Sequence, residues 1–312
     1  EAEARAVLRA SPYDHRAAWA LARATGDPGR YGTAADLFPA HADLQREAGL
    51  LFWDNGLKEA AARCLHRLFE QEPSALGPVL EELLDEDTPR EELERLIPPH
   101  PAPRARFAGE LVRRGRWKEG HEYFQKHVPE TAELAREFDL FADRLREAGQ
   151  WGLEAALRER RLKAASDAPA HAAAAAAWLK LQVYERALER ITFALRIDPA
   201  TAAWDGLKGD ILAAKGARLE AIEAYTAAKA KDPSNVEWIL RRGLLALDER
   251  LHEAAAGDLR EVLRSRPDDR RTRLGLVRAE AALGRKDTAQ LLLEEWIQRH
   301  PEDAGAKSLR NS

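Results

Sequence analysis

Residues 221–233 read Ala-Ile-Glu-Ala-Tyr-Thr-Ala-Ala-Lys-Ala-Lys-Asp-Pro, and the proline that closes this stretch recurs every 34 residues. The four prolines in this register are Pro199, Pro233, Pro267 and Pro301. An alanine lies 12 residues before each proline; these are Ala187, Ala221, Ala255 and Ala289. A larger apolar residue lies eight residues before each proline; these are Ile191, Tyr225, Leu259 and Leu293. The offset of four residues between the two sets predicts one packed face of a helix.

A second helical stretch precedes each of these, for example residues 204–214 and 236–247, and a short turn joins the two. Each unit is therefore predicted to be helix, turn, helix, and the proline ends the second helix because it lacks an N–H. We expect Ser234 and Glu237 to form a capping box for the next helix. Because an alanine lets two helices approach closely, a bulky residue at Ala221 is expected to lower stability by about 1–3 kcal/mol.

The pattern resembles the tetratricopeptide repeat family, whose motif is matched best by Gly209, Ala221, Tyr225, Ala228 and Pro233. The resemblance implies an all-α fold, an α-solenoid of antiparallel helix pairs in a right-handed superhelix, with about seven to nine repeats. The bulky residue expected early in the first helix departs from the motif, since Trp204 and Trp238 lie one position early.

The amino-terminal half carries the same pattern in degenerate form. Residues 48–73 fit one further unit with the same offsets, Gly115 and Gly149 mark the turns of two worn units, and residues 13–41 fit a short one. In the unit after Gly149, we expect Ala155 and Leu157 on the packed face. We predict four segments: degenerate repeats over 1–73, an irregular connector over 74–103, degenerate repeats over 104–167, and regular repeats with a carboxy-terminal cap over 168–312.

The connector at 74–103 is predicted to contain two short helices and a stiff bend. Thr88 is expected to cap the second of them, with Pro89 at its first helical position. The proline cluster that runs from Pro98 to Pro103 favours extended backbone.

Composition excludes several classes of protein. The chain has 312 residues and a formal charge of −4, with 45% hydrophobic residues, so it is predicted to fold around a core. Its pI of about 6.2 disfavours binding to nucleic-acid phosphates. Cys64 is the one cysteine, which excludes an internal disulfide. No apolar run approaches the roughly 18 residues of a membrane span, so we expect no insertion of this chain into a membrane.

The chain contains no methionine and begins in what reads as the middle of a helix, so we interpret it as part of a longer protein. Its bias of arginine over lysine is attributed to a GC-rich bacterial genome. Bacterial cytoplasm and periplasm both remain open.

A search for chemistry finds no catalytic constellation. Cys64 and His66 are two residues apart on a predicted helix and point away from each other, and His121 and His127 share no face. No phosphate-binding glycine loop and no His-Glu-x-x-His pattern is present. We therefore predict no metal, no cofactor and no enzyme activity in this stretch, although a segment upstream of it could be enzymatic. Cys64 is expected to be a buried, inert thiol.

In a solenoid of this kind the first helices line a concave surface, and binding a protein or peptide there is the default function. By the resemblance, the partner-binding residues of the groove are Lys180, Trp204, Leu207, Asp210, Trp238, Arg241, Leu244, Arg271, Leu274 and Arg278. This lining suits an extended or helical peptide with apolar anchors and acidic side chains. We expect Arg241→Glu with Arg278→Glu to abolish partner capture without changing thermal melting.

A second hypothesis comes from residues 93–118, which resemble the carboxy-terminal repeat region of bacterial proteins that join or polymerise O-antigen and other surface polysaccharides. That resemblance implies an accessory domain outside the cytoplasmic membrane, with the catalytic residues elsewhere in the protein. The partner and the oligomeric state stay open under both hypotheses.

Overall fold

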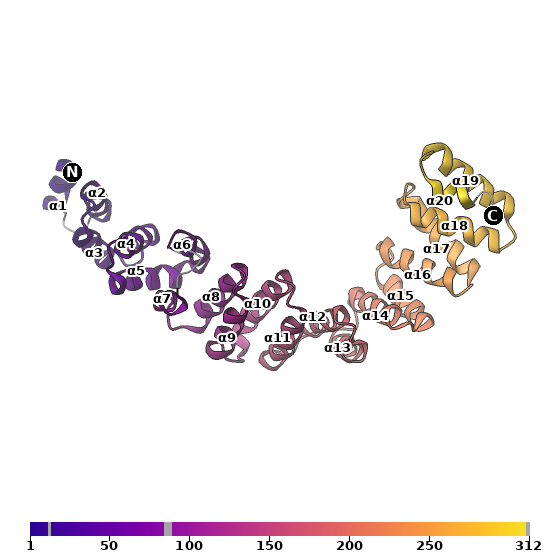
Figure 1. Ribbon diagram of the computed structural model, residues 1–312, viewed down its shortest axis with the longest axis horizontal. Coiled ribbons are helices and arrows are strands. Elements are labelled where there is room, and N and C mark those ends of the chain that lie inside the picture. The colour runs from indigo at the N-terminus through magenta and orange to yellow at the C-terminus, as the bar shows by residue number, and fades with distance from the viewer. Residues whose placement is uncertain (12–13, 84–88, 310–312) are drawn as a thin grey trace. The chain divides into compact units, whose positions relative to one another are not determined.

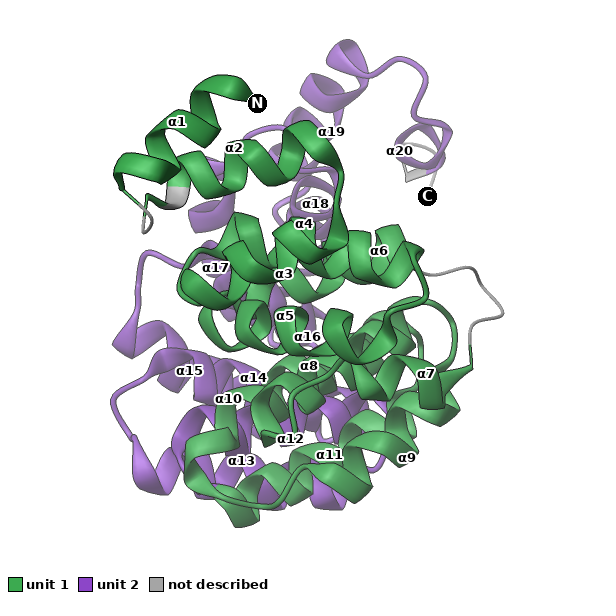
Figure 2. Cartoon of the chain, turned by 90° about the vertical axis from the view of Figure 1, so that its left-hand side faces the viewer, with its two compact units in different colours: residues 1–164 green, residues 165–312 purple. Residues whose placement is uncertain are grey.

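Helices are the dominant secondary structure in the part that the computed structural model describes, which is residues 1–11, 14–83 and 89–309. These residues form α-helices and two short 3-10 turns, and no strand occurs among them. They divide into two compact units, residues 1–164 and 165–312, drawn in green and purple in Figure 2. Each unit is a stack of helix pairs, which confirms the predicted all-α solenoid (Figure 1).

The helices of the first unit are α1 (Ala2–Ala10), α2 (His15–Thr25), α3 (Pro28–Leu37), α4 (Ala42–Asp54), α5 (Lys58–Gln71), α6 (Leu76–Leu83), α7 (Arg90–Arg95), α8 (Pro101–Arg113), α9 (Trp117–His127), α10 (Ala135–Glu147) and α11 (Trp151–Ala164). The 3-10 turns η1 (Pro73–Ala75) and η2 (Ala132–Leu134) precede α6 and α10.

The helices of the second unit are α12 (Ala168–Lys180), α13 (Tyr184–Ile197), α14 (Ala202–Lys215), α15 (Arg218–Lys231), α16 (Val236–Asp248), α17 (His252–Ser265), α18 (Arg270–Ala282), α19 (Lys286–Arg299) and α20 (Ala304–Leu309). Helix α20 packs its fully buried Ala306 against the last helix pair and closes that end of the unit.

One residue with a positive φ angle sets the register of each pair. From α4/α5 onward, with α6 and α7 left aside, the second helix begins two residues after this left-handed residue and the first helix begins 14 residues before it. The left-handed residues are Gly56, Gly115, Gly149, Gln182, Gly216, Arg250 and Gly284. The degenerate amino-terminal repeats thus have the same backbone geometry as the regular ones, although fewer of their side chains match the motif.

The two helices of a pair approach closely at one register position, which holds glycine or alanine in all but the last of these pairs, where it is Val277. Seven positions before the left-handed residue lie the buried residues Gly49, Ala108, Ala142, Ala175, Gly209, Gly243 and Val277. A β-carbon at Gly209 would lie 2.6 Å from a ring carbon of Tyr225, so the ring occupies the space that a side chain would need. Ala221 is fully buried, as expected for a packing position.

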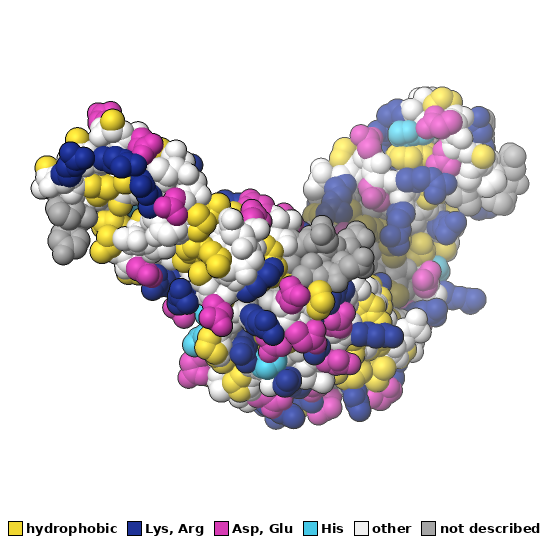
Figure 3. All heavy atoms as spheres, turned by 60° about the vertical axis from the view of Figure 1, so that its left-hand side comes forward, with side chains coloured by type: hydrophobic (Ala, Val, Ile, Leu, Met, Phe, Trp, Pro, Cys, Tyr) yellow, Lys and Arg dark blue, Asp and Glu magenta, His cyan; other side chains and the backbone are white. Residues whose placement is uncertain are grey.

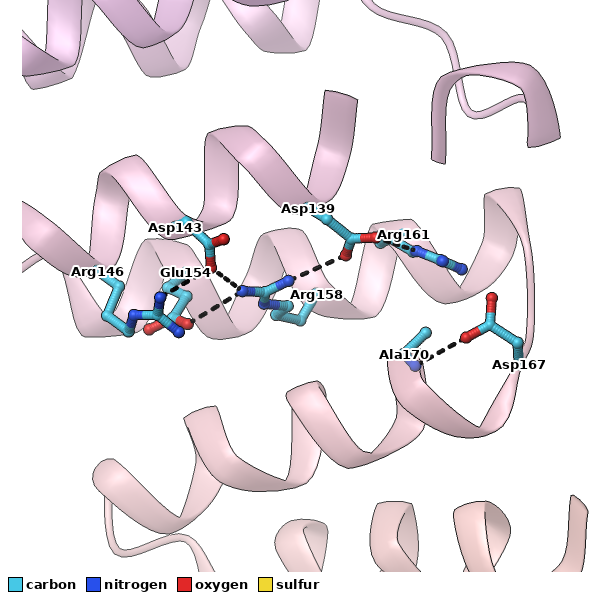
Figure 4. A network of polar contacts seen from close by, with 8 residues as sticks. All are labelled: Asp139, Asp143, Arg146, Glu154, Arg158, Arg161, Asp167 and Ala170. Atoms are coloured by element: carbon cyan, nitrogen blue, oxygen red, sulfur yellow. Dashed lines mark hydrogen bonds and ion pairs between the residues drawn. The ribbon is translucent and has the colours of Figure 1, made fainter. Parts of the chain in front are cut away.

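The pair α10/α11 buries charged side chains beside its apolar ones (Figure 4). The register places Glu154, Arg158 and Arg161 where most other second helices carry alanine or a large apolar residue, and all three are buried. Arg158 donates to Asp139 at 2.9 Å and to Asp143 at 2.6 Å. Arg161 donates to Asp139 at 3.2 Å. The aspartates of α10 therefore pair with the guanidinium groups that α11 buries, although the Nε of Arg158 is buried without a hydrogen-bond partner among the described residues.

The same helix, α11, also carries the two apolar residues that the sequence predicts on its packed face. Ala155 and Leu157 are buried as expected, but they lie beside the charged positions and not at the register positions themselves. In the second unit, Asp167 accepts a hydrogen bond from the Ala170 N–H at 2.8 Å and so caps α12, also drawn in Figure 4.

The region 74–103 contains the two predicted short helices, α6 and α7. The predicted extended connector was wrong over its second half, because α8 begins at Pro101 and includes Pro103. Prolines are tolerated in the first turn of a helix, where their missing N–H groups have no partner to lose. Pro89 precedes the first residue of α7 and does not occupy it. Thr88 lies outside the described residues.

The predicted capping box was also wrong. Asn235 caps α16 by accepting a hydrogen bond from the Glu237 N–H at 3.1 Å, whereas the Ser234 hydroxyl donates to Asp232 at 2.6 Å. Asn caps a helix as well as Ser does, and it stands immediately before the first helical residue. Cys64 is buried as predicted, and burial raises the pKa of its thiol to about 11, so the reactive thiolate is scarce at neutral pH.

Arg250→Gly is expected to stabilise the second unit by about 0.5–1 kcal/mol. Arg250 has a φ of 60°, a conformation that costs an L-residue about 1–2 kcal/mol, and this exceeds the entropy that glycine loses on folding. Urea denaturation followed by circular dichroism measures the change.

Gly216→Ala is the matched control, because Gly216 has a φ of 91° and nothing lies within 4 Å of an added β-carbon. It should destabilise the unit through the backbone alone. An unchanged or lower urea midpoint for Arg250→Gly would contradict the inference that the backbone of Arg250 is strained.

Candidate partner-binding surfaces

The residues predicted to bind a partner fall mainly on one recurring face of the first helices in the second unit. Counted back from the left-handed residue, Arg271 lies 13 positions before it, Leu207 and Arg241 nine, and Asp210, Leu244 and Arg278 six. Spacings of four and then three residues keep these side chains on one side of a helix. The structure therefore places six of the ten predicted residues at equivalent sites of successive first helices.

The other four predicted residues lie elsewhere on the first helices. Lys180 is the last residue of α12 and is exposed. Leu274 is 8% exposed and packs in a cluster with residues of α19, so its side chain belongs to the core. Trp204 and Trp238 are half-buried against the hydrophobic clusters of the unit.

The contact of Trp238 shows why it stands one position early. A β-carbon at Gly206 would lie 2.7 Å from the indole carbon Cε2 of Trp238, so the indole ring covers Gly206 of the preceding first helix. Trp238 thus joins α14 to α16 by packing. Trp204 is also half-buried, and like Leu207 it packs against the hydrophobic cluster that includes residues of α12 and α13.

Asp210 and Arg241 belong to a polar network that crosses from one repeat to the next. The Tyr225 hydroxyl donates to Asp210 at 2.5 Å, and Arg241 forms an ion pair with the same carboxylate. Arg241 also donates to Glu237 at 3.0 Å, and Arg266 pairs with Glu237 at 3.3 Å. Burial and the hydrogen bond to Asp210 raise the pKa of Tyr225, which stays protonated as the donor. The guanidinium group of Arg241 is therefore bound mainly by carboxylates of the same chain.

Arg271 and Arg278 differ from Arg241. They lie two turns apart on α18, both are exposed, and neither forms an ion pair with any residue that the structure describes. Leu244 and Leu207 are half-buried on the equivalent faces of α16 and α14. The face therefore offers apolar side chains on helices next to two guanidinium groups that form no ion pair with any described residue.

The fold and its repeat register have clear relatives. Residues 246–312 match the family model described as tetratricopeptide repeat. The helix pairs thus share the fold of tetratricopeptide repeats. Scaffolds of this family bind other proteins, and the repeats themselves typically carry no catalysis.

Two solved structures resemble the chain in fold. The crystal structure of YrrB, titled a TPR protein with an unusual peptide-binding site, aligns with a TM-score of 0.51 at 17% identity and covers 57% of this chain and 92% of YrrB. The crystal structure of MamA aligns with a TM-score of 0.51 at 16% identity and covers 56% of this chain and 96% of MamA. No curated protein matches the sequence.

No described helix combines the length and the apolar character that crossing a membrane requires. Within residues 1–11, 14–83 and 89–309, no three His, Cys, Asp or Glu side chains gather as a metal site would need.

Sequence reasoning missed a pocket in the first unit. It encloses about 530 Å³ between the segment η1–α6 and the first helices α8 and α10. Its lining includes Arg106, Arg136, Leu140 and Arg144. The turn glycines Gly115 and Gly149 were the signal that could have found it: nine positions before them lie Arg106 and Leu140, the equivalents of Leu207 and Arg241.

Arg241→Glu is expected to lower the free energy of unfolding of the second unit by about 1 kcal/mol. The sequence alone predicts no change in thermal melting for the double substitution that includes it, and the ion pairs of Arg241 revise that prediction. The new carboxylate would face Asp210 and Glu237, and the side chain is 41% exposed, so solvent screens part of the repulsion. Thermal denaturation in low salt measures the loss, and 1 M NaCl should reduce it.

Arg278→Glu is the control, because Arg278 is exposed and has no ion-pair partner among the described residues. Its melting temperature should match that of the unmodified chain. Equal destabilisation by both variants would contradict the role of the Asp210 network.

Proposed function

We propose that the chain captures a partner protein by binding a peptide segment, rich in acidic and apolar side chains, on the first-helix face of its second unit. The segment would contact Leu207, Leu244, Arg271 and Arg278, with Lys180, Trp204 and Trp238 at the borders of the surface. Asp210 and Arg241 would hold the framework through their network, and Leu274 would support it from the core.

The observation that carries this proposal is the contrast between Arg241 and the pair Arg271 and Arg278. Ion pairs satisfy Arg241, whereas the two arginines of α18 keep exposed guanidinium groups that can hydrogen-bond a carboxylate. Half-buried leucines on the neighbouring first helices supply apolar area next to them. Charge and apolar surface together match a peptide that carries both.

The mixed charge on the face drawn in Figure 3 favours recognition of a local charge pattern. On the face drawn in Figure 3, basic and acidic side chains are interspersed, with hydrophobic side chains between them. A uniform polyanion such as nucleic acid is best met by a continuous basic surface. A peptide read by a few matched contacts suits the mixed pattern better.

The hypothesis of an accessory domain for surface-polysaccharide enzymes stays a prediction. Residues 93–118, on which it depends, form the end of α7, the turn before α8, all of α8 and the start of α9. Phe107, Leu111 and Val112 in this stretch are buried in the core of the first unit. Packing thus accounts for the apolar part of the resemblance.

Selection of displayed peptides on the immobilised chain, followed by fluorescence anisotropy, tests the proposal. Selected peptides should carry acidic residues beside apolar ones, and Arg271→Ala with Arg278→Ala should weaken their binding by about tenfold or more. The two substitutions remove exposed side chains without ion-pair partners among the described residues, so helicity should not change.

The matched control is Arg264→Ala with Lys286→Ala, which lowers the charge by the same amount on the second helices α17 and α19. Both side chains are exposed. Binding that survives the α18 substitutions, or that falls equally in the control, would remove this face from the site.

A further inference from the structure

The pocket of the first unit has a charge balance that points to a ligand. Its lining contains four arginines and three glutamates. Arg113 pairs with Glu81 at 2.6 Å and with Glu110 at 2.7 Å, so both carboxylates are bound within the wall, and these three side chains together carry a net charge of −1. The third glutamate, Glu137, is 8% exposed and lies 3.8 Å from Arg106. Two arginines, Arg136 and Arg144, are left without a carboxylate partner from the lining.

These two arginines flank a leucine on one face of α10. Arg136, Leu140 and Arg144 are spaced by four residues each, and all three are exposed and line the pocket. Arg136 forms no ion pair with any described residue, and Arg144 pairs only with Glu147 of its own helix, an exposed pair at 2.9 Å outside the pocket. Leu140 is 44% exposed, a large apolar side chain that water reaches.

The remaining walls are apolar or small. Pro73, Leu76 and Pro78 line one side, and Phe141 lies buried beside Leu140. On α8, a β-carbon added at Gly109 would meet only the side chain of Arg144, at 3.6 Å. The missing side chain of Gly109 thus keeps the pocket open beside Arg144. A volume of about 530 Å³ lies in the usual range of binding pockets.

We propose that this pocket binds an acidic segment of a partner protein in which one apolar side chain lies between two carboxylates. The apolar side chain packs on Leu140 and Phe141, and the carboxylates pair with Arg136 and Arg144. This site is separate from the face proposed in the second unit and does not depend on it.

The spacing of the arginines fixes the spacing of the acidic residues. Eight helical residues separate Arg136 from Arg144, which is about 12 Å at 1.5 Å per residue. In an extended segment two residues four positions apart are separated by about 13 Å. The matching segment therefore has glutamates four positions apart with a leucine midway between them, two positions from each.

The test uses a fluorescein-labelled peptide of this pattern in a glycine and serine background, titrated with the full chain and followed by anisotropy. The peptide should bind, and a version with glutamine in place of both glutamates should bind about tenfold more weakly or not at all. Arg136→Gln and Arg144→Gln should each weaken binding by about threefold to tenfold, as should Leu140→Ala.

The matched control is Arg63→Gln with Lys126→Gln, which removes two exposed charges from the second helices α5 and α9 and should leave binding unchanged. Arg271→Ala with Arg278→Ala should also leave it unchanged, and a loss there would overturn the assignment to this pocket. Equal binding of the glutamine peptide, no binding of the acidic peptide, or full displacement by millimolar phosphate or free glutamate would each overturn the proposal. Circular dichroism of each variant shows whether the fold is intact.

Discussion

The close approach of two helices at a small residue is the constraint on which the rest of the structure depends. Where Gly209 lies against Tyr225, the ring fills the space left by a missing side chain and sets how near the helices come. Gly49 has the same relation to Leu65 in the first unit. Because each pair contacts mainly its neighbours, this local fit is repeated along a stack and decides which face of the first helices remains available.

The pair α10/α11 shows how far this constraint can be met by other chemistry. Its small residue, Ala142, is kept, but the second helix presents Glu154 and Arg158 where an alanine and a large apolar side chain stand elsewhere. A buried guanidinium is tolerated only with partners that offset its desolvation, and two aspartates of α10 provide them. The backbone register is the same as in the other pairs, and the buried charges of α11 pair with the aspartates of α10.

Sequence periodicity predicted the helix pairs of the second unit because Pro233, Ala221 and Tyr225 each have one structural reason to stand where they do. It described the first unit less well, since there Arg158 and Gly120 replace the expected types while the backbone stays in register. The site was harder still. A sequence pattern shows that Arg241 and Arg278 share a face, but only coordinates show that Asp210 and Glu237 already bind the first of them.

Which arginines remain available follows from the repeat itself. Successive first helices bring equivalent positions side by side, so an acidic residue in one repeat meets a basic residue of the next, as Asp210 meets Arg241 across 31 residues. Where the next repeat has no acid at the equivalent position, the guanidinium keeps its hydrogen-bonding capacity for another molecule. Gly109 occupies in α8 the position that Asp210 holds in α14, and Arg144 next to it has only an exposed partner on its own helix. Leu140 holds in α10 the position of Arg241, so the first unit lacks both members of this ion pair at these positions, and the pocket is lined there by Gly109 and Leu140.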